Sequence, residues 1–161
     1  MGDRRRGRRP DGRTGPAARR ASRRSSATSA LTLQRRLVLD AGALIDIETT
    51  PRGETFRSCV KAFDDGYRPY LPTVVLAHVY RDRARQHPLR MVRRLCTLLP
   101  FTEQTADDVG RLLARSRTSD VVDAAVIVAA IEHNAAVLTS DPKDLAKIVS
   151  AAEYPVRLLT V

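Results

Sequence analysis

Apolar and polar positions alternate between strand-like and helix-like spacing from residue 37 to the end of the 161-residue chain. The run LVLD, which ends at Asp40, predicts a strand, and the AGALIDIE that follows it has helical spacing. Strands separated by helices predict an α/β domain, with a mostly parallel central sheet and helices on both faces. Later extended segments are predicted at YRPYLPT (67–73), PFTEQ (100–104), AAVLTSD (135–141) and VRLLTV (156–161).

The segments between these strands have the apolar spacing that is typical of helices. SDVVDAAVIVAAIEHN (119–134) is apolar nearly all round, which indicates a buried helix. TVVLAHVYRDRARQ (73–86) is predicted as one continuous helix capped by Thr73. The other helices are predicted at GETFRSCVKAFDDG (53–66), PLRMVRRLCTLL (88–99), TADDVGRLLARS (105–116) and PKDLAKIVSAAE (142–153).

The net charge of +10 comes from the first 36 residues, which contain 12 Arg and 2 Asp. Residues 37–161 balance 16 basic against 16 acidic side chains. The first segment is rich in Arg, Gly, Pro, Ala and Ser and has no apolar periodicity, so we predict a disordered tail (1–36) and one folded domain (37–161). Nonspecific attraction to nucleic acid phosphates, a solubilising arm, and an extension from an upstream start codon all remain open for the tail.

A secretory signal is not predicted, because the tail lacks an apolar stretch of about 7 to 15 residues. A membrane span is not predicted either, because the sequence has no run of about 18 apolar residues. We therefore expect a cytoplasmic protein without membrane contact. Cys59 and Cys96 stand apart and lack CxxC spacing, so neither a disulfide scaffold nor a zinc site is expected.

Two predicted strands end in aspartate, at Asp40 and Asp141. The carboxyl ends of parallel strands meet at one edge of a sheet, which is the usual ligand-binding edge. Asp120 and Asp123 are three residues apart at the start of the buried helix, which places both on one face of its first turn. If that turn reaches the same edge, four carboxylates converge, and their repulsion favours a bound cation. Oxygen ligands suit Mg²⁺ or Mn²⁺, so the pattern indicates metal-dependent hydrolysis of phosphodiesters.

Each of these aspartates also has a purely structural interpretation. Asp141 precedes Pro142 and is compatible with an N-cap that has proline at the first helical position. Asp40 and Asp120 are likewise compatible with helix caps. Asp123 lies inside an apolar helix, where an unpaired carboxylate is costly, so a cap explains it least.

Residues 37–161 resemble the PIN domain, in particular the toxin ribonucleases of the VapC type. LVLDAGALIDIE is similar to the family's first strand and gives Asp40, and DAAVIVAA is similar to its DxxIAA-like helix and gives Asp123. AVLTSDP is similar to the strand ending in T-x-D, which gives Thr139 and Asp141, and the extra acid Asp120 is like that of actinobacterial members. The resemblance implies a three-layer α/β/α fold. It also implies a metal held by Asp40, Asp123 and Asp141, and a catalytic set that adds Asp120.

One position departs from the family pattern. LPTVVLAHVYRD places His78 where the family usually presents a Glu to the metal. Imidazole suits Mn²⁺ better than Mg²⁺, and action through water, contact with a phosphate, and packing without a catalytic role all remain open. Arg81, three residues on, would share the helix face of His78 and contact a phosphate or a site carboxylate, or remain a solvated surface arginine.

The resemblance therefore implies a metal-dependent endoribonuclease that acts on RNA, a toxin held inactive by an antitoxin protein, and a homodimer. The alternative is a catalytically degenerate PIN-like protein that binds RNA or an antitoxin and cleaves nothing. A phosphoacceptor receiver domain would need an acid pair at the first strand and a lone acceptor Asp on a middle strand, and neither is present. A noncatalytic RNA-binding module is disfavoured by the 4% aromatic content and the absence of Trp.

Overall fold

Five parallel strands form the central sheet of this computed structural model, which describes residues 36–81 and 83–161. Their order in the sheet is β3-β2-β1-β4-β5, and every neighbouring pair is parallel. The predicted α/β fold with a parallel sheet is confirmed, whereas the predicted tail lies, apart from Arg36, outside the described residues. The strands are β1 (Leu37–Leu39), β2 (Tyr70–Pro72), β3 (Thr97–Leu99), β4 (Ala136–Thr139) and β5 (Leu158–Thr160).

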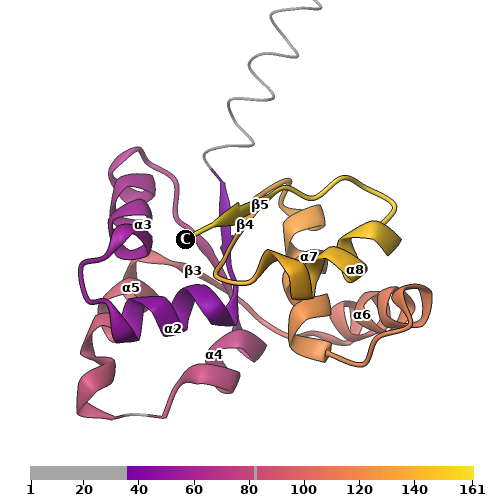
Figure 1. The fold of residues 1–161 in the computed structure, drawn as a ribbon, viewed down its shortest axis with the longest axis horizontal. Coiled ribbons are helices and arrows are strands. Elements are labelled where there is room, and N and C mark those ends of the chain that lie inside the picture. Colours follow the sequence, from indigo (N-terminus) through magenta and orange to yellow (C-terminus); the bar gives the residue numbers. More distant parts are fainter. Residues whose placement is uncertain (1–35, 82) are drawn as a thin grey trace, which may run out of the picture. The chain divides into compact units, whose positions relative to one another are not determined.

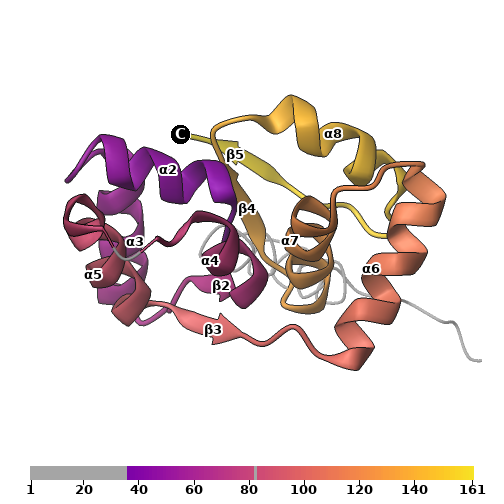
Figure 2. The same ribbon diagram turned by 90° about the horizontal axis from the view of Figure 1, so that it is seen from below.

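Helices cover both faces of this sheet, which gives three layers (Figures 1 and 2). On one side lie α2 (Ala41–Thr49), α3 (Glu54–Asp64) and α5 (His87–Leu95), and on the other lie α6 (Glu103–Ser116), α7 (Val121–Glu132) and α8 (Pro142–Ala151). The short α4 (Thr73–Val79) follows β2 directly and contacts both α2 and α7. Across the described residues, none of the helices combines the length and the apolar character that a membrane span requires.

The centre of the core is formed by β1, β4 and α7. Every residue of β1 and β4 is buried, and so is every residue of α7 from position 124 to position 130. Parallel strands covered on both faces need near-continuous apolar runs, and LVL and AVLT are such runs. α7 is apolar nearly all round because it contacts β1, β2 and β4 as well as α6 and α8.

Three predicted elements differ from the structure. The strand predicted at 100–104 is wrong, because β3 ends at Leu99 and α6 begins at Glu103. β3 lies inside the segment predicted as the helix 88–99. It is an edge strand with two exposed residues, so its sequence does not show the apolar pattern of a buried strand. The helix predicted over 73–86 ends at Val79, where Tyr80 adopts an extended backbone conformation.

Cys59 and Cys96 are free thiols buried in the core. Burial raises the pKa of each thiol to about 12. Both remain protonated and unreactive at neutral pH, which agrees with a packing role.

The order of the strands reverses between β1 and β4, which lie side by side at the centre of the sheet. The chain runs from β1 to β2 on one side, whereas β4 leads to β5 on the other. The carboxyl ends of strands at such a reversal form the crevice in which open α/β sheets bind ligands. Asp40 follows β1 and Thr139 ends β4, so two predicted site residues lie at this reversal.

Candidate functional site

Asp40 and Thr139 join the ends of β1 and β4 through their side chains. Thr139 Oγ1 donates a hydrogen bond to Asp40 Oδ2 at 2.5 Å, and both residues are buried. The backbone N–H of Asp40 also donates to the carbonyl of Leu138 at 3.2 Å. The bond from Thr139 orients the Asp40 carboxylate at the strand reversal. It also supplies the donor that a buried carboxylate needs.

The first turn of α2 lies very close to the segment that follows β4. A Cβ atom added to Gly42 would lie 2.2 Å from Ser140 Oγ and 3.2 Å from the backbone nitrogen of Ser140. Glycine at this position therefore permits the helix that follows Asp40 to approach the segment that carries Asp141.

The first turn of α7 brings Asp120 and Asp123 to the same edge of the sheet. Asp120 is the N-cap of α7, and its Oδ1 accepts a hydrogen bond from the backbone N–H of Asp123 at 3.0 Å. This bond satisfies one of the N–H groups that a helix start leaves unpaired. The capping interpretation of Asp120 is thus confirmed, and the Asp123 side chain stands half-buried beside it.

Negative charge accumulates around Asp123. The pKa of its carboxyl is raised from 3.8 to about 6, first by burial and then by the charges of Asp120, Asp40 and Asp144. The charge of His78 acts in the opposite direction and lowers it. Asp40, Asp120 and Asp123, predicted separately from the sequence, therefore interact in the folded chain.

Asp141 caps a helix, as its place before Pro142 predicts. It is the N-cap of α8, where its Oδ1 accepts a hydrogen bond from the N–H of Lys143 at 3.1 Å and its own N–H donates to Thr139 Oγ1 at 3.1 Å. Asp144, three residues on, is the carboxylate of this segment that acts on Asp123. The role of Asp141 as a metal ligand stays a prediction.

Sequence reasoning missed Asp144, although a signal for it was present. TSDVVD (118–123) and TSDPKD (139–144) share the pattern TSDxxD, and each lies at the start of a helix. In both copies the first aspartate caps the helix, and the second, in the first turn, belongs to the charge cluster around Asp123. The repeated tripeptide thus marks the start of two helices. Each of these helix starts contributes one first-turn carboxylate to the charge cluster.

The chemistry of this donor set suits a hard divalent cation. Within residues 36–81 and 83–161, no three or more His, Cys, Asp or Glu side chains lie in an arrangement that could hold a metal ion. The donors at the edge are carboxylate oxygens, which Mg²⁺ and Mn²⁺ prefer, and a cation would remove the repulsion that raises the pKa of Asp123. The residues therefore fit such an ion in chemistry.

His78 lies near enough to act on Asp123, and Arg81 does not share its helix face. His78 is in the last turn of α4 and is exposed, so its interpretation as a packed histidine is wrong. Arg81 lies beyond the end of α4, and its Nη1 donates to the carbonyls of Ala77 at 3.1 Å and Tyr80 at 2.9 Å. Cationic side chains are favourable at a helix C-terminus, so Arg81 stabilises the end of α4.

A family model for the PIN domain matches residues 37–150 of this chain. The chain therefore belongs to the PIN domain family, as its sequence motifs predict. The matched segment contains every carboxylate discussed above. A comparison with curated proteins gave no match.

Solved structures with a similar fold include VapBC2 from Rickettsia felis bound to a DNA fragment from its promoter, with 13% identity and a TM-score of 0.58, covering 78% of this chain and 98% of that chain. DNA-bound VapBC from Salmonella typhimurium has 18% identity and a TM-score of 0.57, covering 78% and 97%. FitAcB from Neisseria gonorrhoeae has 17% identity and a TM-score of 0.51, covering 77% and 96%. At these identities the similarity concerns the fold, and it agrees with the resemblance to VapC-type proteins.

Proposed function

We propose that this protein is a VapC-type endoribonuclease that hydrolyses RNA phosphodiester bonds with Mg²⁺ or Mn²⁺. The observation that carries the proposal is the half-buried Asp123 carboxyl, whose pKa is raised to about 6 by burial and by neighbouring carboxylates. Gathering like charges in this way costs stability unless a cation binds, which is why such groups are typical of functional sites. Membership of the PIN domain family supports a nuclease.

In this proposal Asp40, Asp123 and Asp141 hold the ion, and Asp120 completes the catalytic set. A bound Mg²⁺ or Mn²⁺ supplies neutralisation of the phosphoryl oxygens and lowers the pKa of a bound water. Thr139 holds the Asp40 carboxylate in place through its hydroxyl. The negative charge of the surrounding carboxylates attracts the cation to the site.

Three further residues have roles outside this set. His78 and Arg81 are both exposed, and in this proposal they contact the phosphates of the RNA rather than the ion. Asp144 is a further candidate ligand, because it already interacts with Asp123.

Metal titration of the wild type and of Asp123→Asn tests this proposal. We expect Mn²⁺ and Mg²⁺ to raise the melting temperature of the wild type and to support cleavage of single-stranded RNA, and expect both effects to be lost in Asp123→Asn. Asp64→Asn, a change at an exposed aspartate at the end of α3, is the matched control and should behave as the wild type. Undiminished cleavage by Asp123→Asn would reject the metal site. Metal binding without cleavage in the wild type would favour the degenerate binding protein.

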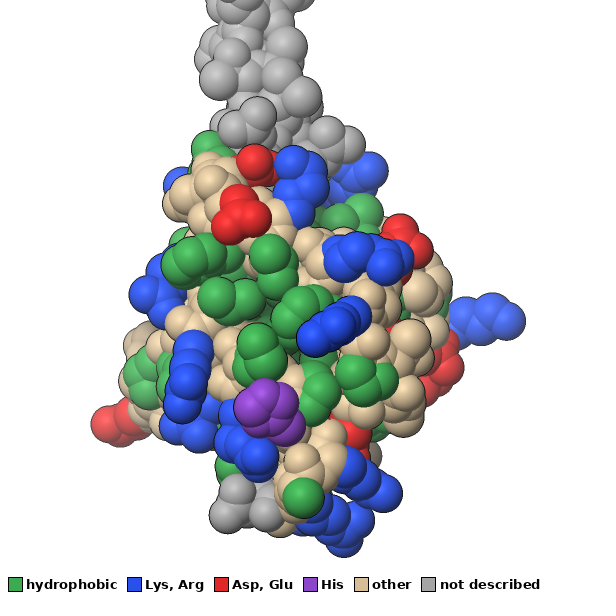
Figure 3. All heavy atoms as spheres, turned by 90° about the vertical axis from the view of Figure 1, so that its left-hand side faces the viewer, with side chains coloured by type: hydrophobic (Ala, Val, Ile, Leu, Met, Phe, Trp, Pro, Cys, Tyr) green, Lys and Arg blue, Asp and Glu red, His purple; other side chains and the backbone are tan. Residues whose placement is uncertain are grey.

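The proposal also includes an antitoxin partner and a homodimer, in line with the resemblance to VapC-type toxins and to the VapBC structures. The face that carries α3 and α5 gathers hydrophobic side chains between basic ones (Figure 3). Phe63 on α3 and Met91 on α5 are 42% and 46% exposed, and contiguous exposed apolar surface marks a site of protein contact. Sedimentation of the purified chain tests the homodimer, and a monomer at all concentrations would remove that part of the proposal.

A further inference from the structure

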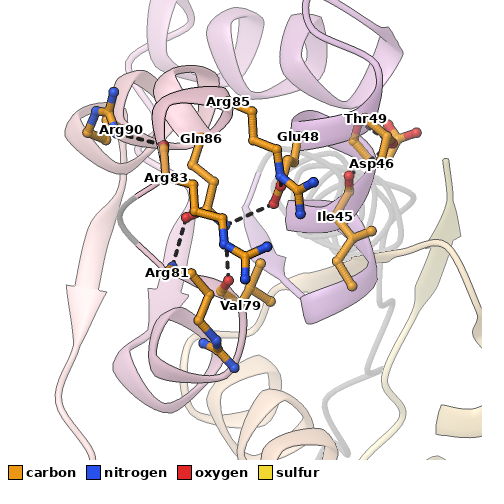
Figure 4. A network of polar contacts seen from close by, with 10 residues as sticks. All are labelled: Ile45, Asp46, Glu48, Thr49, Val79, Arg81, Arg83, Arg85, Gln86 and Arg90. Carbon is orange, nitrogen blue, oxygen red and sulfur yellow. Dashed lines mark hydrogen bonds and ion pairs between the residues drawn. The ribbon is translucent and has the colours of Figure 1, made fainter.

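A pocket of about 590 Å³ is lined in part by His78, one of the groups that act on Asp123. We call it the arginine pocket. It lies between α2 and the segment that joins α4 to α5 (Figure 4). The polar side chains that define it are Glu48, His78, Arg81, Arg83, Arg85 and Gln86.

The floor of the arginine pocket is built around a buried glutamine. Gln86 is 2% exposed, and its Nε2 donates to Glu48 Oε2 at 2.9 Å and to the carbonyl of Val79 at 3.1 Å. Its Oε1 accepts a hydrogen bond from the backbone N–H of Arg81 at 2.7 Å. Gln86 thereby joins α2, the end of α4 and the returning chain, so it holds the segment that carries the arginines in one conformation.

The charge of the arginine pocket is positive. Its described lining contains three arginines and one carboxylate, that of Glu48. Glu48 is engaged already: its Oε1 lies 2.6 Å from Arg85 Nε, and hydrogen bonding by Gln86, together with the charges of Arg85 and Arg83, holds its pKa below the usual value although burial opposes this. Among the described residues, no carboxylate contacts the guanidinium groups of Arg81 and Arg83, which are exposed.

We infer that the arginine pocket binds backbone phosphates of the RNA strand next to the bond that is cleaved. A strand laid across the carboxylate cluster is repelled there by negative charge, and a metal ion neutralises only the phosphate at which it acts. The flanking phosphates need cations of their own, and arginine side chains are the common donors to phosphate oxygens. The arginine pocket, which shares His78 with the cluster, offers such cationic side chains.

This inference rests on the proposed function for the nature of the strand, and it adds a subsite for the backbone. Contacts to phosphates fix the position of a strand without reading its sequence. The arginine pocket should therefore contribute affinity and register in the site, whereas sequence preference arises elsewhere.

Binding of a short single-stranded RNA of mixed sequence, followed by fluorescence anisotropy in EDTA over a range of KCl concentrations, tests the inference. For a single strand, each phosphate contact adds about −0.7 to the slope of log K against the logarithm of the salt concentration. A tenfold fall in salt, to about 0.1 M, therefore raises the affinity about fivefold for each contact. The double variant Arg83→Gln/Arg85→Gln should make this slope shallower by about 0.7 to about 1.4.

Two further variants separate charge from structure. Glu48→Gln keeps hydrogen-bonding groups beside Gln86 and Arg85 but removes the one described carboxylate, so it should bind RNA more tightly with a steeper slope. A purely structural role of the network would instead weaken binding in this variant as well. Arg57→Gln is the control, because Arg57 is an exposed arginine on α3 that lies outside the arginine pocket.

The outcomes distinguish this inference from the proposed function. If Arg83→Gln/Arg85→Gln changes neither the salt slope nor the affinity, the inference is overturned even if the wild type cleaves RNA. The occupant of the pocket would then be a protein partner. A shallower slope in a protein that cleaves nothing upholds the subsite and rejects the nuclease. If both hold, cleavage of a dinucleotide, which has no internucleotide phosphate besides the one that is cleaved, should be equal in wild type and double variant, while cleavage of a longer strand falls.

Discussion

Replacing Asp123 with asparagine should stabilise this protein at neutral pH when divalent ions are removed. The half-buried carboxyl lies among the charges of Asp120, Asp40 and Asp144, and its pKa is raised from 3.8 to about 6. Asparagine has nearly the same shape and no charge. The substitution therefore removes the repulsion and the burial of a charge while it keeps the packing of the first turn of α7.

The sign and size of the effect follow from the two pKa values. Because the pKa of Asp123 is higher in the folded chain than in the unfolded chain, the folded state binds the proton more tightly, and the free energy of unfolding falls as the pH rises from 3.8 to about 6. At about 1.4 kcal/mol per pKa unit the full shift corresponds to about 3 kcal/mol. Screening by water at a half-exposed side chain reduces this to about 1–2 kcal/mol.

Urea denaturation in EDTA at about pH 4 and about pH 8, on either side of the two pKa values of Asp123, measures the prediction. Asp123→Asn should exceed the wild type by about 1–2 kcal/mol at the higher pH and by little at the lower one. Asp64→Asn, an exposed aspartate on α3, should show no such gain. Added Mg²⁺ should stabilise the wild type and narrow the difference. A variant that is less stable than the wild type at both pH values would refute the charge cluster as the origin of the effect.

Two other substitutions test the neighbours of this cluster. Thr139→Val removes the donor to the buried Asp40 carboxylate and should lower the free energy of unfolding by about 1–3 kcal/mol, measured by urea denaturation. Thr139→Ser, which keeps the hydroxyl, should lose much less, and equal losses would show that the hydrogen bond is not the cause. His78→Glu should strengthen Mg²⁺ binding in calorimetric titrations, because it adds near Asp123 a carboxylate, the ligand that this ion prefers. Equal Mg²⁺ affinity in wild type and variant would reject a ligand role for position 78.

The elements that the sequence predicted well are those surrounded by other elements. β1, β4 and α7 are buried on every side, so their sequences LVL, AVLT and VVDAAVIVAAIE contain little but apolar residues, and the pattern is unambiguous. The elements predicted poorly lie at the edge. β3 has exposed side chains on an edge strand, and the end of α4 is followed by charged residues whose spacing is compatible with helix or loop.

The candidate site shows the same division among single residues. Spacing in the sequence was sufficient to place Asp40 and Asp123 at one edge, because strand ends and first helical turns have fixed geometry. Asp141 and Asp144 are three residues apart at the start of α8, and the sequence motif singled out Asp141 without indicating Asp144. The N-cap at Asp141 was predictable from Pro142, whereas only the folded chain shows that Asp144 acts on Asp123.

The sequence by itself determined the layers of this protein, the family to which it belongs and the sheet edge at which its acids gather. These features depend on local spacing and on burial, and both can be inferred from the order of apolar and polar residues. The tertiary structure alone decided which carboxylates interact, and it alone brought Glu48 on α2 to Gln86, 38 residues further on, to build the arginine pocket. Side chains so far apart in the chain meet only when helices pack, and no local pattern encodes the distance between them.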